Sequence, residues 1–177
     1  MRYVSIEDCQ KFVFPYIYSQ LSDVEPSAAY ESEKAGLADL KKVLELIQSD
    51  TFYPSFYDKA AYLLCSISGS QYFSNGNKRL ALTTLVQFLI LNEIPLKTFT
   101  DDEYQKLLFK IFPKHTWEKN TYIEEGHPLF LYNLAIIIGD RTVWGEGVDF
   151  SDLKQKIGEI FEVIYRLPEL GGSAIDK

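Results

Sequence analysis

The segment from Asn75 to Leu91 constrains the fold of this 177-residue chain more than any other. It starts with the letters NGNKR and continues into an apolar run that is hydrophobic on most sides of a helix. Such a helix must be buried, so we predict a helix from about Asn77 to Leu91 at the centre of a helical bundle. Asn92 and Pro95 predict where this helix ends.

The start of the same helix has the features of an anion-binding site. Asn75, Gly76 and Asn77 are small or carry amides, and they let backbone N–H groups converge where a helix has no partners for its first N–H groups. Lys78 and Arg79 place two cations at the end of the helix where the dipole disfavours positive charge, which indicates an anion such as phosphate. The alternative interpretation is a loop and helix cap with two solvated cations.

Hydrophobic periodicity predicts helices along nearly all of the chain, and therefore an all-α fold. The expected helices begin after Ser5, include the stripe from Leu37 to Ile47, and cover about 58–67, 101–111, 128–138 and 151–165. The exception is 51–57, where strand-forming aromatic residues are interrupted by Pro54. This segment predicts an exposed edge or a short β-hairpin, with an aromatic loop over the core as the alternative.

Length and charge restrict the class of protein. The length is enough for one buried core and too short to need two, so 1–177 is predicted to form a single domain. The net charge of −7 excludes an extended basic face, so neither nucleic acid nor a membrane surface is an expected partner. The sequence shows no signal peptide or membrane-spanning run, which predicts a cytoplasmic protein. Cys9 and Cys65 have no metal or disulfide spacing and are expected to be buried thiols.

The stretch Gln71–Arg79 resembles the signature of the Fic/Doc (Fido) family, H-x-F-x-[D/E]-[G/A]-N-[G/K]-R. Its NKR ending is similar to the death-on-curing (Doc) toxin branch. Glu33–Leu37 and Phe52–Leu63 also resemble the lead-in of that branch. The resemblance covers about 1–115 and leaves about 116–177 as a C-terminal helical addition.

The resemblance implies a Fic/Doc-type helical bundle with a central motif helix and a short β-hairpin flap. It implies an activity that moves AMP or phosphate from a nucleotide, such as ATP with Mg²⁺, to a hydroxyl of a target protein. Phosphate binding would fall to Asn75, Gly76, Asn77, Lys78 and Arg79, with Phe73 in the motif core. Phe52 and Tyr53 would lie in the flap, which docks a target by strand addition.

Two departures from the signature bear on catalysis. The family's general base is a His, and Gln71 in its place has no useful basicity near pH 7. The family's acidic Mg²⁺ ligand is replaced by Asn75, whose neutral oxygen is a weaker ligand for a hard cation. The remaining histidines, His115 and His127, are expected in surface loops, not as replacement bases.

Three functions follow from these residues. The first is a degenerate or weakly active Fic/Doc-like protein that keeps a nucleotide-phosphate site. The second is an active, toxin-like AMP- or phosphotransferase with a non-standard base. The third is a non-catalytic protein-interaction module that binds no nucleotide. The expected partners are a nucleotide and a protein, either a target or an antitoxin-like partner.

Overall fold

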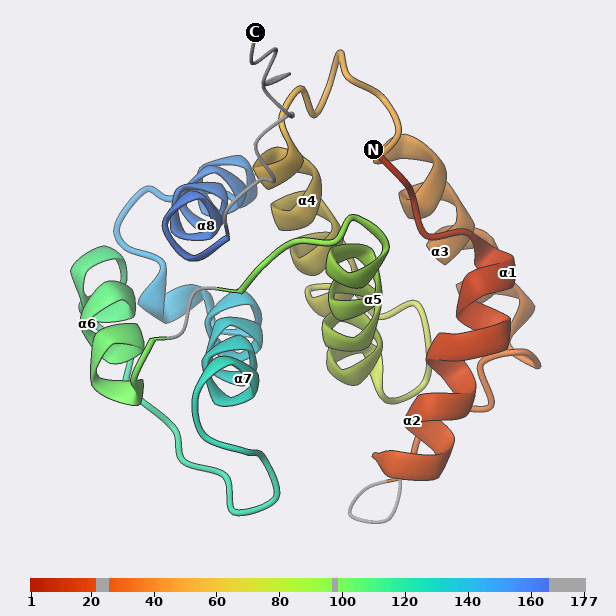
Figure 1. Ribbon diagram of the computed structural model, residues 1–177, viewed down its shortest axis with the longest axis horizontal. Helices are drawn as coiled ribbons and strands as arrows, with labels where there is room; N and C mark the ends of the chain where they lie inside the picture. Colours follow the sequence, from red (N-terminus) through yellow and green to blue (C-terminus); the bar gives the residue numbers. More distant parts are fainter. Residues whose placement is uncertain (22–25, 97–98, 166–177) are drawn as a thin grey trace, which may run out of the picture.

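The computed structural model describes residues 1–21, 26–96 and 99–165, and this part of the chain is mostly helical (Figure 1). The α-helices are α1 (Ile6–Asp8), α2 (Phe14–Gln20), α3 (Lys34–Leu46), α4 (Phe56–Ser68), α5 (Asn77–Leu91), α6 (Asp101–Ile111), α7 (His127–Gly139) and α8 (Phe150–Ile164). A π-helix, η1 (Cys9–Val13), joins α1 to α2, and a 3-10 turn, η2 (Arg141–Val143), follows α7.

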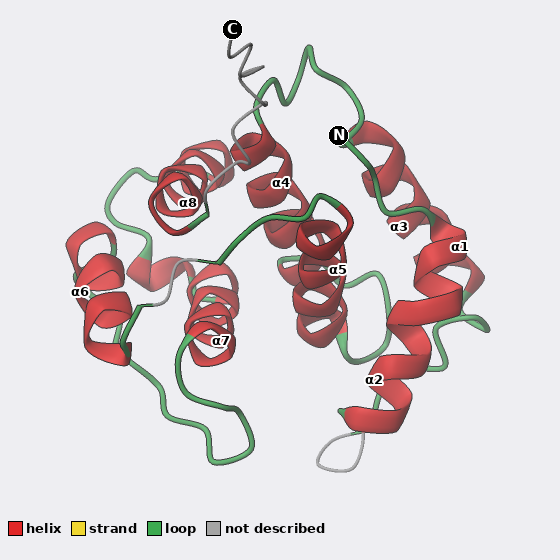
Figure 2. Ribbon diagram, viewed as in Figure 1, coloured by secondary structure: helices red, strands yellow, loops and turns green. Residues whose placement is uncertain are grey.

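The all-α prediction is confirmed. Figure 2 shows helices and loops without strands in the described ranges, where the only β-type pairing is an isolated bridge between Leu96 and Tyr165. None of the helices described here is long and apolar enough to cross a membrane. Cys9 and Cys65 are free and buried, as predicted.

Four helix starts are fixed by local sequence. Each of α1, α4, α6 and α8 begins with a capping box, in which two residues three apart exchange side-chain and backbone hydrogen bonds. The pairs are Ser5 with Asp8, Ser55 with Asp58, Thr100 with Glu103, and Asp149 with Asp152.

The most enclosed helix is α4, not the motif helix α5. Ten of the thirteen residues of α4 are buried, and α4 packs against α3, α5, α7 and α8. In Figure 1, α4 and α5 stand between α1–α3 on one side and α6–α8 on the other. The motif helix α5 thus lies between the two groups of helices and packs against α2, α4 and α7, but one of its faces is open, where Ile90 is 64% exposed.

The predicted β-hairpin is not formed at 51–57. Residues 50–52 form a turn, across which the Tyr53 N–H donates to the Ser49 carbonyl at 3.0 Å, and α4 already begins at Phe56. A buried lysine fixes the approach to these turns, because Lys59 Nζ donates to the Ile47 carbonyl at 2.8 Å. Strand-forming side chains need a partner strand, and none lies beside this segment in the described residues.

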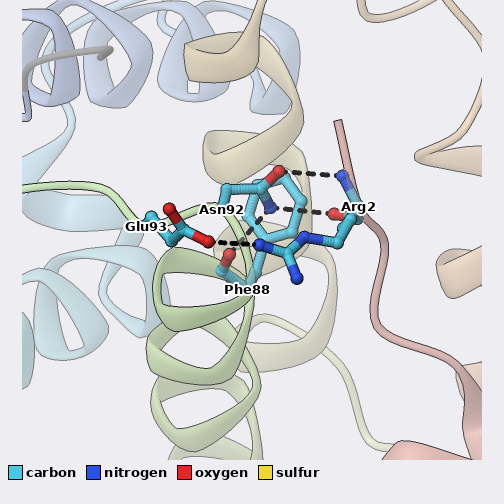
Figure 3. A network of polar contacts seen from close by, with 4 residues as sticks. All are labelled: Arg2, Phe88, Asn92 and Glu93. Carbon is cyan, nitrogen blue, oxygen red and sulfur yellow. Dashed lines mark hydrogen bonds and ion pairs between the residues drawn. The ribbon is translucent and has the colours of Figure 1, made fainter.

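The amino-terminal segment is held against the end of α5 (Figure 3). The Asn92 side chain accepts a hydrogen bond from the Arg2 backbone N–H at 2.8 Å and donates to the Arg2 carbonyl at 2.8 Å. Arg2 also forms an ion pair with Glu93 at 2.7 Å. The Asn92 side chain therefore pairs with both backbone polar groups of Arg2 at the position where α5 ends.

A buried polar side chain of α7, Asn133, holds the loop before this helix. Asn133 Oδ1 lies 2.9 Å from His115 Nε2 and accepts from the Glu118 N–H at 2.8 Å, while its amide donates to the carbonyls of Glu118 and Leu129. His115 is 6% exposed, so the expectation that it lies in a surface loop is wrong. The loop folds inward because Asn133 satisfies its polar groups.

His127 is also not in a surface loop, since it is the first residue of α7 and lies 2.8 Å from the hydroxyl of the buried Tyr165. Burial lowers the pKa of His127 to about 4, from an ordinary value of 6.5. Protonation therefore favours the unfolded chain, and the stabilisation is complete above pH 6.5 and lost as the pH falls toward 4.

We expect this group to make the protein about 2 kcal/mol less stable at pH 5 than at pH 7.5. Urea unfolding of the wild type and of His127→Gln at both pH values checks this, because glutamine keeps a polar partner for Tyr165 and does not titrate. The wild type should lose about 2 kcal/mol more than the variant. An identical loss in both proteins would contradict the assignment.

Candidate functional site

The signature loop is closed by the side chain of Asn77, the first residue of α5. Asn77 Oδ1 accepts a hydrogen bond from the Phe73 N–H at 3.0 Å, and Asn77 Nδ2 donates to the Phe73 carbonyl at 2.8 Å. Phe73 is buried in the core. Gly76 completes the turn with φ 78°, a left-handed conformation that favours glycine.

Two residues outside the signature, Tyr30 and Gly36, fix the position of this loop. The Tyr30 hydroxyl donates to the Gly76 carbonyl at 3.0 Å, and its ring meets Phe73 edge-on with ring centroids 4.9 Å apart. Burial raises the pKa of Tyr30 to about 12, so the hydroxyl remains a donor. Gly36 lets α3 approach closely, because a methyl group there would meet the Tyr72 carbonyl and come within 2.8 Å of the Phe73 ring.

Arg79 is engaged by backbone carbonyls of the chain itself. Its guanidinium donates to the Leu21 carbonyl at 2.7 Å and to the Pro26 carbonyl at 2.9 Å. Asn75 Nδ2 donates to the same Pro26 carbonyl at 2.6 Å. The two motif residues therefore hold the backbone of Leu21 and Pro26 at the start of α5, with donors that a phosphate group would need.

A carboxylate of the same chain already binds the loop. Glu33, next to the start of α3, accepts hydrogen bonds from the Ser74 backbone N–H at 2.8 Å and from the Ser74 hydroxyl at 2.5 Å. Asn75 Oδ1 accepts from the Gly76 N–H at 2.6 Å. The Gly76 N–H of the expected anion cradle and the neighbouring Ser74 N–H thus have internal acceptors.

The positive charge of Lys78 lies near the carboxyl end of another helix, α7. Its side chain lies beside Gly139, the last residue of α7, where a methyl group would come within 3.6 Å of Lys78 Cε. The carboxyl end of a helix favours positive charge. The Lys78 charge is therefore unfavourable relative to the dipole of α5 and favourable relative to the dipole of α7.

Gln71 is exposed and makes no hydrogen bond with the part of the chain that the structure describes. Neither histidine takes its place. His115 is bound to Asn133, and His127 lies at the opposite end of α7 from Gly139, which a helix of this length separates by about 18 Å.

Phe52 and Tyr53, the expected docking flap, precede α4, whereas the signature loop follows it. The helix separates these two backbone segments by about 18 Å. Tyr53 reaches along α4 and stacks on Tyr62 with ring centroids 4.1 Å apart. Phe52 is 67% exposed and lies on the wall of an open cavity next to α8.

The residues at the signature do not fit a firmly held Mg²⁺ ion. The expected ligand, Asn75, is neutral, and its Oδ1 already accepts from Gly76. Within residues 1–21, 26–96 and 99–165, no group of three His, Cys, Asp or Glu side chains could hold a metal. We derive no chemistry that depends on this ion.

Sequence reasoning missed Tyr30, Gly36 and Glu33 as parts of the site. Glu33 and Gly36 lie in a segment that had been noticed for its family resemblance, but their contacts with the loop come from the packing of α3. Tyr30 carries no pattern that marks it. No family model, curated protein or solved structure matches this chain.

Proposed function

We propose that this protein is a degenerate Fic/Doc-like protein that has lost the transfer reaction and acts by binding another protein. The observation that carries the proposal is the engagement of the signature by the chain itself. Arg79 donates to the carbonyls of Leu21 and Pro26, and Glu33 accepts from Ser74. These contacts give the signature a bracing role in the fold.

The absence of transfer chemistry follows from the residue at the position of the family's base. The amide of Gln71 cannot take a proton from a hydroxyl at neutral pH, and proton transfer of that kind contributes about 10² to 10⁴ in rate. Both histidines are bonded elsewhere. An active transferase with a non-standard base therefore could not use either histidine as that base.

A second candidate is nucleotide binding without transfer, and one observation favours it. The start of α5 has no side-chain cap, so the N–H groups of Asn77 and Lys78 still point toward the loop. A phosphate group could accept from them beside the Lys78 ammonium. Engaging Arg79 as well would require exchange of its bonds to Leu21 and Pro26.

Isothermal titration calorimetry with ATP, with and without Mg²⁺, distinguishes the two candidate functions. We expect no saturable heat at ATP concentrations up to a few millimolar under either condition. Saturable binding that is lost in Lys78→Ala, and kept in the distant control Lys110→Ala, would establish the second candidate and overturn the first.

Transfer from labelled ATP to the protein itself or to cell lysate is expected to be undetectable for the wild type, for Gln71→His, and for Gln71→His with Asn75→Asp. The base alone does not restore activity because Arg79 and Glu33 remain bound within the chain. Label transfer by the wild type would show that the reaction proceeds with Gln71 in place of the family's His. A gain of about 10² or more in the double variant would show that the phosphate site is intact.

A further inference from the structure

An open cavity lies where α8, part of the C-terminal addition, meets the turns before α4. Its volume is about 320 Å³. Residues 52–54 form one wall, and the first turns of α8 contribute Ser151, Lys154 and Gln155, with Asp58 of α4 also lining the cavity. The signature residues take no part in its walls.

Lys154 determines which charged groups this cavity can attract. Its ammonium lies 5.9 Å from the ring centroid of Tyr53, 5.7 Å from that of Tyr62 and 5.5 Å from that of Phe150. Rings at this range attract a cation and restrict where it can move. Lys154 makes no hydrogen bond or ion pair with any residue that the structure describes, so its donors remain available at the cavity wall.

Two carboxylates near Lys154 cap helices: Asp58 lines the same cavity, and Asp149 has a pKa that backbone hydrogen bonds and, to a lesser degree, the charge of Lys154 lower. Asp58 accepts from the Ser55 N–H and hydroxyl, and this capping box starts α4. Asp149 accepts from the N–H groups of Ser151 and Asp152 and starts α8. Neither carboxylate forms an ion pair with the Lys154 ammonium, so the carboxylate of a bound partner can form one.

The wall formed by residues 52–54 offers contacts that suit a peptide better than a small free anion. Phe52 is 67% exposed beside the stacked ring of Tyr53, which offers apolar contact. The backbone N–H groups of Thr51 and Phe52 make no hydrogen bond within the described ranges, so they can pair with the main chain of a bound segment.

We propose that this cavity binds an extended peptide segment of a partner protein, with an acidic side chain on Lys154 and a neighbouring apolar side chain against Phe52 and Tyr53. The inference rests on the proposed protein-binding function and names the chemistry of the partner. It does not involve the signature loop, so the nucleotide titration and the peptide experiment can fail separately.

The test uses ¹⁵N-labelled protein of full length and NMR titration with three probes. These are the peptide acetyl-Leu-Asp-Leu amide, its counterpart with Asn in place of Asp, and sodium acetate. We expect the Asp peptide to shift the amide signals of Phe52 and Lys154 and to bind about tenfold more tightly than the Asn peptide. Equal affinities, shifts confined to other regions, or acetate binding as tightly as the Asp peptide would overturn the proposal.

Two variants sharpen the result. Lys154→Met keeps an unbranched chain among the rings and removes the cation, so both peptides should bind it equally weakly. Lys106→Met removes an exposed cation from α6 and should leave the tenfold preference unchanged. A preference for the Asp peptide that survives in Lys154→Met would assign the carboxylate to another group and overturn the role of Lys154.

Discussion

Replacing Asn77 with alanine is expected to lower the free energy of unfolding by about 2 to 4 kcal/mol. The change leaves both backbone polar groups of the buried Phe73 without their partner, and each such loss costs about 1 to 3 kcal/mol. Urea unfolding at pH 7.5 measures the effect. The loss belongs to the folded loop and not to any ligand, so it should be the same with and without ATP.

Two further variants control for this reading. Asn77→Asp keeps an acceptor for the Phe73 N–H but cannot donate to the Phe73 carbonyl, so its loss should be intermediate. Asn120→Ala removes one exposed hydrogen bond, to the Tyr122 N–H, and should cost less than 1 kcal/mol on the scale of about 0.5 to 1.5 kcal/mol for a typical bond. A loss below 1 kcal/mol in Asn77→Ala would show that the loop is not held by this side chain.

Arg79→Ala is expected to lower the free energy of unfolding by about 2 to 3 kcal/mol. Its guanidinium donates to two backbone carbonyls that are 58 and 53 residues away in sequence, and hydrogen bonds of charged groups contribute about 1.5 to 3 kcal/mol each before solvent screening. Arg79→Lys, which places a single point charge, should recover less than half of the loss.

The same variant separates the two candidate functions. If Arg79 serves the fold, the free energy of unfolding falls and no ATP binding is seen in either protein. If Arg79 serves a phosphate, ATP stabilises the wild type in a thermal melt and fails to stabilise Arg79→Ala. Stabilisation of the wild type by ATP that is lost in Arg79→Ala would therefore contradict the bracing role that we assign to Arg79.

Much of the fold is visible in the sequence because it is local. The start of α6 follows from the capping box at Thr100, and the motif helix was placed from Asn77 to Leu91 by its apolar run and its end at Asn92. The exposed face of α5 was not visible, because an apolar run cannot say which of its sides a neighbouring helix covers.

The site shows the same division. The signature loop is a continuous stretch of sequence, and its position directly before the helix Asn77–Leu91 could be predicted. The partners of Lys78 and Arg79 were not, because the end of α7 and the carbonyl of Pro26 reach them from more than fifty residues away. A cation at a helix start suggested a missing anion, and the actual partners are supplied by tertiary contacts.

The position of α4 between the two groups of helices has a consequence during synthesis on the ribosome. Ser68 ends α4 and Ile164 ends α8, which packs along it. The intervening 96 residues (164 − 68) take about 5 to 20 s to translate at about 5 to 20 residues per second. For that interval the apolar side of α4 that faces α8 has no cover, so the nascent chain presents a surface to chaperones until nearly its last helix has emerged.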